Sequence, residues 1–448
     1  MFKKILIANR GEIAIRIIRA CKELNIATVA VHSTADEHSL HVRFADEAVC
    51  IGPPQSDKSY LNIPAIISAA EITDADAIHP GYGFLAENAE FAEVCEKCRI
   101  RFLGPKPDHI RQMGHKSAAR ELAKKSGVPT IPGSESMVHT LEEAVSVAEG
   151  VGYPLMLKAA AGGGGRGMRV IRSAEDMGKM FEVVRSEAGA AFGDPSVYIE
   201  KYIENPKHVE VQIMADAHGT VLSLGERDCS IQRRHQKLVE ETPCPVLPEA
   251  ARRAMSECAV TLASAIGYES LGTVEFLFDQ TTGAYYFIEM NTRIQVEHTV
   301  TEAITTLDLV KEQIRIAAGE KLRFKQEDIK FFGHSIECRV NAEDPFTFIP
   351  CPGEITGLNI PGGPGVRVDT ALYVESTVQP YYESLVAKLI VHGIDRREAM
   401  AKMTRALSEF HIAGIKTTIP LLVEVMASPE FRSGKYHTGS MDKLLAER

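Results

Sequence analysis

The hydrophobic pattern of the first part of the chain alternates between short apolar runs and helical spacing. The runs Lys4–Ala8 and Thr28–His32 are typical of buried strands, and Ile13 and Ile17 recur between them at the spacing of one helix face. Strands that alternate with helices predict a doubly wound parallel sheet, so we expect an α/β fold for residues 1–115. The expected strands are 4–8, 28–32, 45–51 and 75–78, and the expected helices are 11–24 and 64–70.

A different pattern begins after a segment at 129–133 that contains Pro and Gly. Thr140 and Glu143 are three residues apart, as in the capping box that opens a helix. A glycine-rich run, Gly162–Gly167, lies between two expected strands. This mixture predicts an α+β organisation beyond the first sheet. The expected strands are 153–158, 168–171, 197–203, 208–214 and 221–224, and a helix is expected at 396–410.

One expected hairpin brings two carboxylates together. Its strands are rich in β-branched and aromatic residues, and a five-residue loop would pair Asp279 with Tyr285. In that register Glu275 lies directly opposite Glu289, and Asn291 lies two residues further along the same face. Carboxylate and amide oxygens suit Mg²⁺ or Mn²⁺ better than zinc. The alternative is an ordinary hairpin with a polar solvent face.

Composition and charge exclude several classes of protein. The chain has 448 residues and a formal net charge of −10, which argues against nucleic acid or an anionic membrane as its main partner. No stretch approaches the ~20 consecutive apolar residues of a membrane span. The nine cysteines are scattered and odd in number, which is typical of reduced thiols. We therefore expect a cytoplasmic protein.

Two further segments could bind phosphate groups. The glycine run is not a P-loop, because Met168 and Arg169 stand where Lys and Ser or Thr would be required. Its glycines would still let the backbone approach a polyphosphate, and the alternative is a hairpin tip that binds nothing. The segment Gly225–Lys237 contains four cationic side chains and His235. Without further context, such a run is usually a solvated face.

Five motifs occur together and in order, and they carry a resemblance to a known family. They are Ile7–Ile13, His79–Phe84, Gly162–Gly167, Glu226–Lys237 and Glu289–His298. With them the chain resembles ATP-grasp enzymes, and more narrowly the biotin carboxylase subunits of bacterial acetyl-CoA carboxylases, essentially from end to end. The resemblance implies an N-terminal domain at 1–115, a linker and ATP-grasp lid subdomain at 116–203, and an ATP-grasp core with a C-terminal domain at 204–448.

The resemblance also implies the reaction and its catalytic residues. ATP, bicarbonate and biotin would give carboxybiotin, ADP and phosphate through carboxyphosphate. Bicarbonate is a poor nucleophile, so it needs a cationic cradle and a base, and Glu297 would be the base. The cradle would be Lys237, Arg293, Gln295 and Val296, and the biotin site would be Arg339, Tyr82 and Gln295.

The nucleotide and metal sites follow from the same resemblance. ATP would be held with two Mg²⁺ or Mn²⁺ ions, since phosphoryl transfer needs positive charge on the phosphate oxygens. The metal ligands would be Glu275, Glu289 and Asn291. The other residues expected to bind ATP are Lys116, Lys158, Gly163, Gly164, Gly165, Glu200, Lys201, Ile203, His208, Gln232 and His235.

The expected partners are a separate biotin carboxyl carrier protein, carboxyltransferase subunits and a second copy of the chain. Met400–Met403 is similar to the Met-Lys-Met biotinylation site, but it lies in the expected helix at 396–410, so biotin is expected on another protein. Three alternatives stay open: the equivalent subunit of a pyruvate or propionyl-CoA carboxylase, another ATP-grasp ligase that joins a carboxylate to an amine, and a non-catalytic nucleotide-binding regulator. The last would be expected to have lost Glu275, Glu289 or Glu297, and all three are present.

Overall fold

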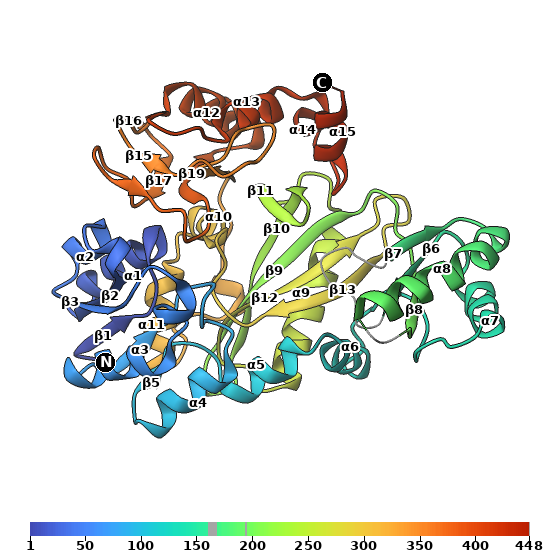
Figure 1. The fold of residues 1–448 in the computed structure, drawn as a ribbon, viewed down its shortest axis with the longest axis horizontal. Coiled ribbons are helices and arrows are strands. Elements are labelled where there is room, and N and C mark those ends of the chain that lie inside the picture. Colours follow the sequence, from blue (N-terminus) through green and yellow to red (C-terminus); the bar gives the residue numbers. More distant parts are fainter. Residues whose placement is uncertain (160–167, 193–194, 448) are drawn as a thin grey trace. The chain divides into compact units, whose positions relative to one another are not determined.

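The computed structural model describes residues 1–159, 168–192 and 195–447, drawn as a ribbon in Figure 1. The chain forms two compact units. The first consists of residues 1–128, 207–277 and 289–448, and the second of residues 129–206 and 278–288. Among the described residues, no helix combines the length and the apolar composition that crossing a bilayer would require.

The first unit begins with the expected parallel sheet, whose order is β3-β2-β1-β4-β5 (Figure 1). Its strands are β1 Lys4–Ile7, β2 Ala27–Ser33, β3 Glu47–Gly52, β4 Ala77–His79 and β5 Arg101–Phe102. The helices are α1 Gly11–Glu23, α2 Leu40–Phe44, α3 Ile63–Ile72, α4 Ala89–Lys97, α5 Pro107–Gly114 and α6 Lys116–Lys125. The predicted doubly wound α/β class is confirmed.

The two faces of this sheet bury different clusters. Ile5 and Ile7 pack with Ile17 of α1, whereas Leu6, which points to the opposite face, packs with Phe91 of α4. Covering a parallel sheet on both sides leaves its strand ends for function. There, Asn9 donates from Nδ2 to the carbonyls of Pro80 and Tyr82 at 2.7 Å, which fixes the loop after β4.

The remainder of the first unit is built on an eight-stranded sheet with the order β13-β12-β9-β10-β11-β14-β19-β17. The strands are β9 Lys207–Ala215, β10 Val221–Arg233, β11 Gln236–Thr242, β12 Ser270–Phe278, β13 Tyr285–Asn291, β14 His334–Asn341, β17 Val366–Thr370 and β19 Leu385–Gly393. The helices are α9 Glu249–Ala265, α10 His298–Thr305, α11 Leu309–Ala317, α12 Arg396–Glu409, α13 Ile419–Ala427, α14 Pro429–Ser433 and α15 Ser440–Ala446. Two small sheets pair β15 Gly353–Glu354 with β18 Thr377–Val378 and β16 Gly357–Asn359 with β20 His411–Ala413.

β14 separates an apolar face from a polar one. Cys338 and Leu389 are directly opposite each other on β14 and β19, and both belong to the core that also contains Met403 of α12. The neighbouring pair, Arg339 and Lys388, therefore points to the other face of the sheet. That second face carries most of the chemistry described below.

The second unit is small. Its sheet has the order β7-β6-β8, formed by β6 Leu155–Ala159, β7 Met168–Ile171 and β8 Val197–Lys201, with helices α7 Leu141–Val151 and α8 Ala174–Phe192. The capping box of Thr140 and Glu143 opens α7 as predicted. The glycine run joins β6 to β7, and its residues lie outside the described part of the chain.

The turn of the expected hairpin differs in detail from its prediction. The amide of Asp279 donates to the carbonyl of Ala284 at 2.8 Å, and the amide of Gly283 donates to the carbonyl of Asp279 at 2.9 Å. The assumed pairing of Asp279 with Tyr285 is therefore wrong at the turn. The side chain of Asp279 accepts hydrogen bonds from the amides of Thr281 and Thr282, and these bonds make the loop one residue shorter than expected.

Candidate active site

A largely buried lysine is the centre of the candidate site. Lys237 Nζ lies 2.5 Å from Glu210 Oε2, 3.0 Å from Glu275 Oε1 and 2.7 Å from Glu297 Oε1. The three carboxylates come from β9, β12 and the N-cap of α10, so the lysine joins three separate elements. Only 12% of the Lys237 side chain is exposed. At such burial the ion pairs are poorly screened by solvent.

The tight turn between β10 and β11 places Lys237. Arg233 pairs with Gln236, and the two residues between them, Arg234 and His235, have φ of 47° and 67°. Two consecutive positive φ angles are typical of a hairpin turn of two residues. The turn brings Lys237 directly opposite Gln232, which is 7% exposed.

Charge fixes the protonation states at this centre. Burial alone would lower the pKa of Lys237, but Glu210, Glu275 and Glu297 raise it well above its usual value. Burial would likewise raise the pKa of Glu297, but Lys237 and Arg339 hold it well below the usual range. Lys237 is therefore a cation and Glu297 an anion at neutral pH.

Arg339 on β14 extends this network. Its Nη2 donates to Glu297 Oε2 at 2.8 Å and its Nε donates to Glu240 Oε1 at 2.6 Å. These two carboxylates are the ion-pair partners of Arg339, while Glu343 on the same chain segment accepts a hydrogen bond from Ser384. Glu297 is thus held by one cation at each of its two oxygens.

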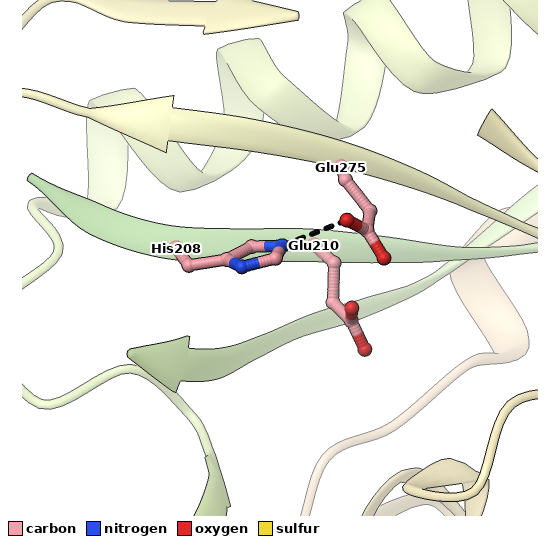
Figure 2. Close-up of side chains that lie close together, drawn as sticks. All are labelled: His208, Glu210 and Glu275. Atoms are coloured by element: carbon pink, nitrogen blue, oxygen red, sulfur yellow. Dashed lines mark hydrogen bonds and ion pairs between the residues drawn. The ribbon is translucent and has the colours of Figure 1, made fainter. Parts of the chain in front are cut away.

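The expected metal ligand Glu275 has a full set of polar neighbours. Its Oε2 lies 2.8 Å from His208 Nε2, and its Oε1 accepts from Asn291 Nδ2 at 2.8 Å and from Gln295 Nε2 at 2.9 Å. Figure 2 shows His208 and Glu275 joined by this contact, with the carboxylate of Glu210 beside them. Ligand atoms of these three residues lie within 4.8 Å of one another. Lys237 already places its ammonium group between Glu210 and Glu275, so this trio needs no metal ion.

Glu275, Glu289 and Asn291 offer two carboxylates and an amide oxygen, the ligand types that hard divalent cations prefer. Burial and the charge of Glu275 raise the pKa of Glu289, as happens when two carboxylates share a site without enough positive charge. Lys116 Nζ lies 3.7 Å from Glu289 Oε2, but its side chain is 85% exposed. An oxygen-rich site with residual negative charge is what Mg²⁺ or Mn²⁺ requires.

Arg293 lies at the edge of this acidic group. Its Nε donates to Glu87 Oε2 at 2.8 Å and its Nη2 donates to Asn291 Oδ1 at 3.1 Å. The amide of Thr292 donates to the other carboxylate oxygen of Glu87 at 3.2 Å. The guanidinium is therefore held in place by the loop that precedes α4.

Tyr82 belongs to a second buried group, next to Arg339. Its hydroxyl donates to Glu12, and Lys388 Nζ lies 3.2 Å from the same Glu12 oxygen. Lys388 Nζ also donates to the carbonyl of Val296 at 2.9 Å. The Val296 carbonyl is therefore already bonded, and Lys388 fixes the backbone next to Glu297.

Four of the predicted nucleotide residues lie in the second unit and are described with it. Lys158 on β6 forms an ion pair with Glu200 on β8. Lys201 Nζ donates to the carbonyls of Gly152 and Tyr153, each at 2.9 Å. Ile203 is buried. The predicted Gly163, Gly164 and Gly165 lie outside the described residues.

The first unit therefore brings together many of the predicted residues. The contacts above connect His208, Lys237, Glu275, Asn291, Arg293, Gln295, Glu297 and Arg339. Lys116 and Glu289 form a separate pair. His235 is at an exposed turn and makes no contact with them in the described structure.

Sequence reasoning missed several buried charged residues. Glu210 is fully buried and lies 2.6 Å from Arg227, whose guanidinium also donates to Gln295 at 2.8 Å. The signal was present, because polar residues at 208, 210 and 212 alternate along one face of a strand. Glu337 gave the same signal, because polar residues at 335, 337, 339 and 341 alternate along β14. Lys388 gave none, since it stands alone in an apolar strand.

Comparisons with known proteins agree with this fold and site. The chain matches the families described as "Biotin carboxylase, N-terminal domain" over residues 1–110, "Carbamoyl-phosphate synthase L chain, ATP binding domain" over 115–325 and "Biotin carboxylase C-terminal domain" over 337–443. A biotin carboxylase from Nostoc is 57% identical, with 99% of each chain covered. One of the pyruvate carboxylase subunits of Methanothermobacter thermautotrophicus is 54% identical over 99% of this chain and 90% of the relative.

The chain also matches a solved structure over nearly its full length. The biotin carboxylase domain dimer of the Hydrogenobacter thermophilus 2-oxoglutarate carboxylase, in complex with MgADP, ADP and bicarbonate, superposes with a TM-score of 0.89. It is 52% identical, with 99% of this chain and 98% of that chain covered.

The match to the ATP-binding domain and the carboxylates grouped around Lys237 define the class of protein, which is an ATP-grasp ligase. The identity of 57% to the Nostoc biotin carboxylase over nearly the full length of both chains narrows the class further. The chain belongs to the biotin carboxylase family, and its reaction is the ATP-dependent carboxylation of biotin.

Proposed function

We propose that the chain catalyses the first half-reaction of an acetyl-CoA carboxylase, in which biotin on a separate carrier protein is carboxylated with ATP and bicarbonate. The observation that carries this proposal is that Glu297 is hydrogen-bonded to Lys237 through one oxygen and to Arg339 through the other. One carboxylate between two fixed cations provides a base and two anion-binding groups within one site. An amine ligase would need neither the base nor the second cation.

The first step makes bicarbonate nucleophilic. Lys237 and Arg293, with Gln295 and the backbone at Val296, would bind the anion, and Glu297 would take its proton. Glu297 is held ionised, so it is in the proton-accepting form. Bicarbonate would compete with Glu297 for Lys237, and as this contact weakens, Glu297 becomes a stronger base.

The deprotonated bicarbonate would attack the γ-phosphorus of ATP and release ADP. Glu275, Glu289 and Asn291 would hold Mg²⁺ or Mn²⁺, which neutralises charge on the phosphate oxygens when bound. Lys116 and Lys158 would add positive charge to the phosphates, together with the glycines at 163–165. The adenosine side would be contacted by Glu200, Lys201, Ile203, His208, Gln232 and His235.

The second step carboxylates biotin. Carboxyphosphate would break into CO₂ and phosphate, the phosphate would take the proton from the ureido nitrogen, and that nitrogen would attack the carbon of CO₂ to form carboxybiotin. The developing negative oxygen would be stabilised by Arg339, which is always cationic. Tyr82 and Gln295 would form walls of this pocket.

Biotin is proposed to arrive on a carrier protein, with carboxyltransferase subunits receiving it. Lys402, the lysine of Met400–Met403, lies within α12 and donates to the carbonyl of His392 at 2.8 Å, which is unlike a lysine offered at a hairpin tip. A homodimer is proposed because the Hydrogenobacter relative is a dimer. All nine cysteines are free thiols, which supports a reducing compartment such as the cytoplasm.

A second candidate is the equivalent subunit of a pyruvate or 2-oxoglutarate carboxylase. The specific observation in its favour is the 54% identity to the Methanothermobacter relative, close to the 57% of the Nostoc enzyme. Residues of the carboxylation site do not distinguish these systems, since the acyl acceptor is bound elsewhere.

The test is Mg²⁺-dependent ADP release from the purified chain, measured without bicarbonate, with bicarbonate, and with bicarbonate plus free biotin. We expect release to need bicarbonate and to rise with biotin. If ADP release depends on neither bicarbonate nor biotin, the substrate assignment is wrong. Carrier proteins of acetyl-CoA and pyruvate carboxylases, compared as acceptors at equal concentration, then separate the two candidates.

A further inference from the structure

Two buried glutamates lie directly opposite each other beside Arg339. Glu240 on β11 pairs with Glu337 on β14 in an antiparallel register, and both are 0% exposed. Directly opposed residues have Cβ atoms roughly 4.5–5.5 Å apart and point to the same face of the sheet. Two ionised carboxylates at that separation in a buried site repel each other strongly.

Each glutamate has one bonded oxygen and one without a partner. Glu240 Oε1 accepts from Arg339 Nε at 2.6 Å, and Glu337 accepts from the Thr299 hydroxyl through Oε2. Glu240 Oε2 and Glu337 Oε1 are buried and, among the described residues, have no hydrogen-bond partner. A buried polar atom without a partner is costly, and one shared proton would satisfy both oxygens.

The surrounding charges leave Glu337 without a dedicated cation. The groups that face it are Glu240 from β11, Arg339 on its own strand, Lys388 from β19, Thr299 from α10 and Tyr82 from the loop after β4. Lys388 is already bonded to Glu12 and to the carbonyl of Val296, and Arg339 to Glu240 and Glu297. Within the described structure Glu337 forms no ion pair.

We propose that Glu337 is protonated in the working enzyme and donates this proton to Glu240, so that the pair carries one negative charge and positions Arg339 for biotin. Burial raises the pKa of Glu337 to about 8, with Lys388 opposing and Glu240 adding to the shift, which agrees with this geometry. Glu337 is a positioning residue, since it acts only through Glu240 and Arg339. The proposal rests on the proposed role of Arg339 in binding biotin.

The consequence is a pH-dependent biotin site. Below about pH 8 the single charge of the pair balances Arg339 and leaves its Nη2 group free to bind both Glu297 and biotin. When Glu337 ionises, a second negative charge draws the guanidinium toward β11 and β14. Free biotin has no group that titrates between pH 7 and 9, so a change in its KM over that range reports on the protein.

The first experiment compares wild type with Glu337→Gln, which keeps the shape of the side chain and is permanently neutral. At pH 7 we expect KM for biotin within about twofold of wild type. Between pH 7 and 9 we expect KM for biotin to rise several-fold in wild type and to stay constant in the variant. The pH dependence of KM for ATP should be the same in both proteins. The proposal is overturned if KM for biotin rises as much in the variant as in wild type, or if KM for biotin is already much higher in the variant at pH 7.

Glu240→Gln is the matched variant on the opposite strand. It removes the charge that Arg339 needs, so KM for biotin is expected to rise about tenfold already at pH 7, with little further change at pH 9. If Glu240→Gln and Glu337→Gln behave alike at both pH values, the two residues do not have the distinct roles assigned here.

Two further measurements separate this proposal from the biotin role of Arg339. Difference infrared spectra should show the carbonyl stretching band of a protonated carboxyl group at pH 7 that is absent from Glu337→Gln, and no such band overturns the shared proton. Arg339→Ser should raise KM for biotin. If it does not while the band is present, the proton stands and the assigned role of Arg339 is wrong.

Discussion

Lys237 and Glu297 form a buried ion pair of 2.7 Å in which each group fixes the charge of the other. Lys237 also neutralises Glu210 and Glu275, so it stabilises three carboxylates from different elements. The same contacts hold β9, β12 and the start of α10 together around Lys237. Catalytic arrangement and folding stability are therefore coupled at this lysine.

Lys237→Met should lower both stability and activity. Removing one partner of a buried ion pair leaves an uncompensated charge, at a cost of about 3–5 kcal/mol. Here the cost should shrink as pH falls, because burial raises the pKa of Glu210 and its protonation would leave fewer uncompensated charges. Thermal unfolding measured over a series of falling pH values tests this. Lys443→Met, which removes only an exposed ion pair, is the control and should change little.

Glu297→Gln should abolish carboxylation while leaving nucleotide binding within a few-fold. The amide keeps the shape of the side chain but cannot accept the proton of bicarbonate, so bicarbonate-dependent ADP release should fall at least about 100-fold. Glu327→Gln, a surface substitution, should behave like wild type. Turnover of Glu297→Gln at the wild-type rate would remove Glu297 from the role of base.

Arg339→Ser should impair the biotin half of the reaction selectively. Removing a group that stabilises a developing oxyanion costs about 100-fold or more in turnover. We expect that loss in biotin carboxylation, and a much smaller change in ATP affinity measured by equilibrium binding. Equal losses in both would indicate that Arg339 serves only as the structural partner of Glu240 and Glu297.

The metal site can be tested through its most exposed carboxylate. Glu289 has no side-chain partner closer than Lys116 at 3.7 Å in the described structure, so Glu289→Gln should leave the fold intact. The concentration of Mg²⁺ that gives half-maximal ADP release should rise about tenfold or more, and chelation should stop release in wild type. Glu204→Gln, an exposed residue of the second unit, is the control. An unchanged Mg²⁺ requirement would exclude Glu289 as a ligand.

Local pattern was sufficient to predict the parallel sheet and most of the strands, because apolar periodicity and burial coincide there. β1, predicted at 4–8, is Lys4–Ile7, and α12, predicted at 396–410, is Arg396–Glu409. The strands around the basic segment were predicted too short. β10 runs through Arg233, because a charged residue such as Arg227 is buried together with an ion-pair partner, Glu210, directly opposite on the neighbouring strand β9.

The residues of the candidate site were predicted in different ways. Lys237 and Glu297 stand in continuous motifs, Glu275 was predicted from the expected hairpin register, and Arg339 only from the overall resemblance. Glu240 and Lys388 become functional neighbours through strand register across β11, β14 and β19, which no local pattern reveals. Burial of a lone charge depends on tertiary partners, so it has no signature in the sequence.

A buried carboxylate near the end of β11 anchors the C-terminal segment. Glu241 on β11 is 0% exposed and lies 2.7 Å from Arg396 Nε and 2.5 Å from His334 Nε2. The Tyr436 hydroxyl donates to it at 2.6 Å. Burial opposes ionisation, but His334 and Arg396 lower the pKa of Glu241 to about 2.

Glu241→Gln should therefore destabilise the protein in a pH-dependent way. A carboxyl group with a lowered pKa contributes stability above the unfolded value near 4.3, and this contribution is lost as pH falls toward its folded value. The shift from 4.5 to about 2 corresponds to about 3 kcal/mol at pH 7. Differential scanning calorimetry should find the largest difference in unfolding temperature between wild type and Glu241→Gln at pH 5–7, and a smaller one at each step from pH 4.5 to 3. A difference that stays constant down to pH 3 would mean that lost packing, and not the charge of Glu241, accounts for the effect.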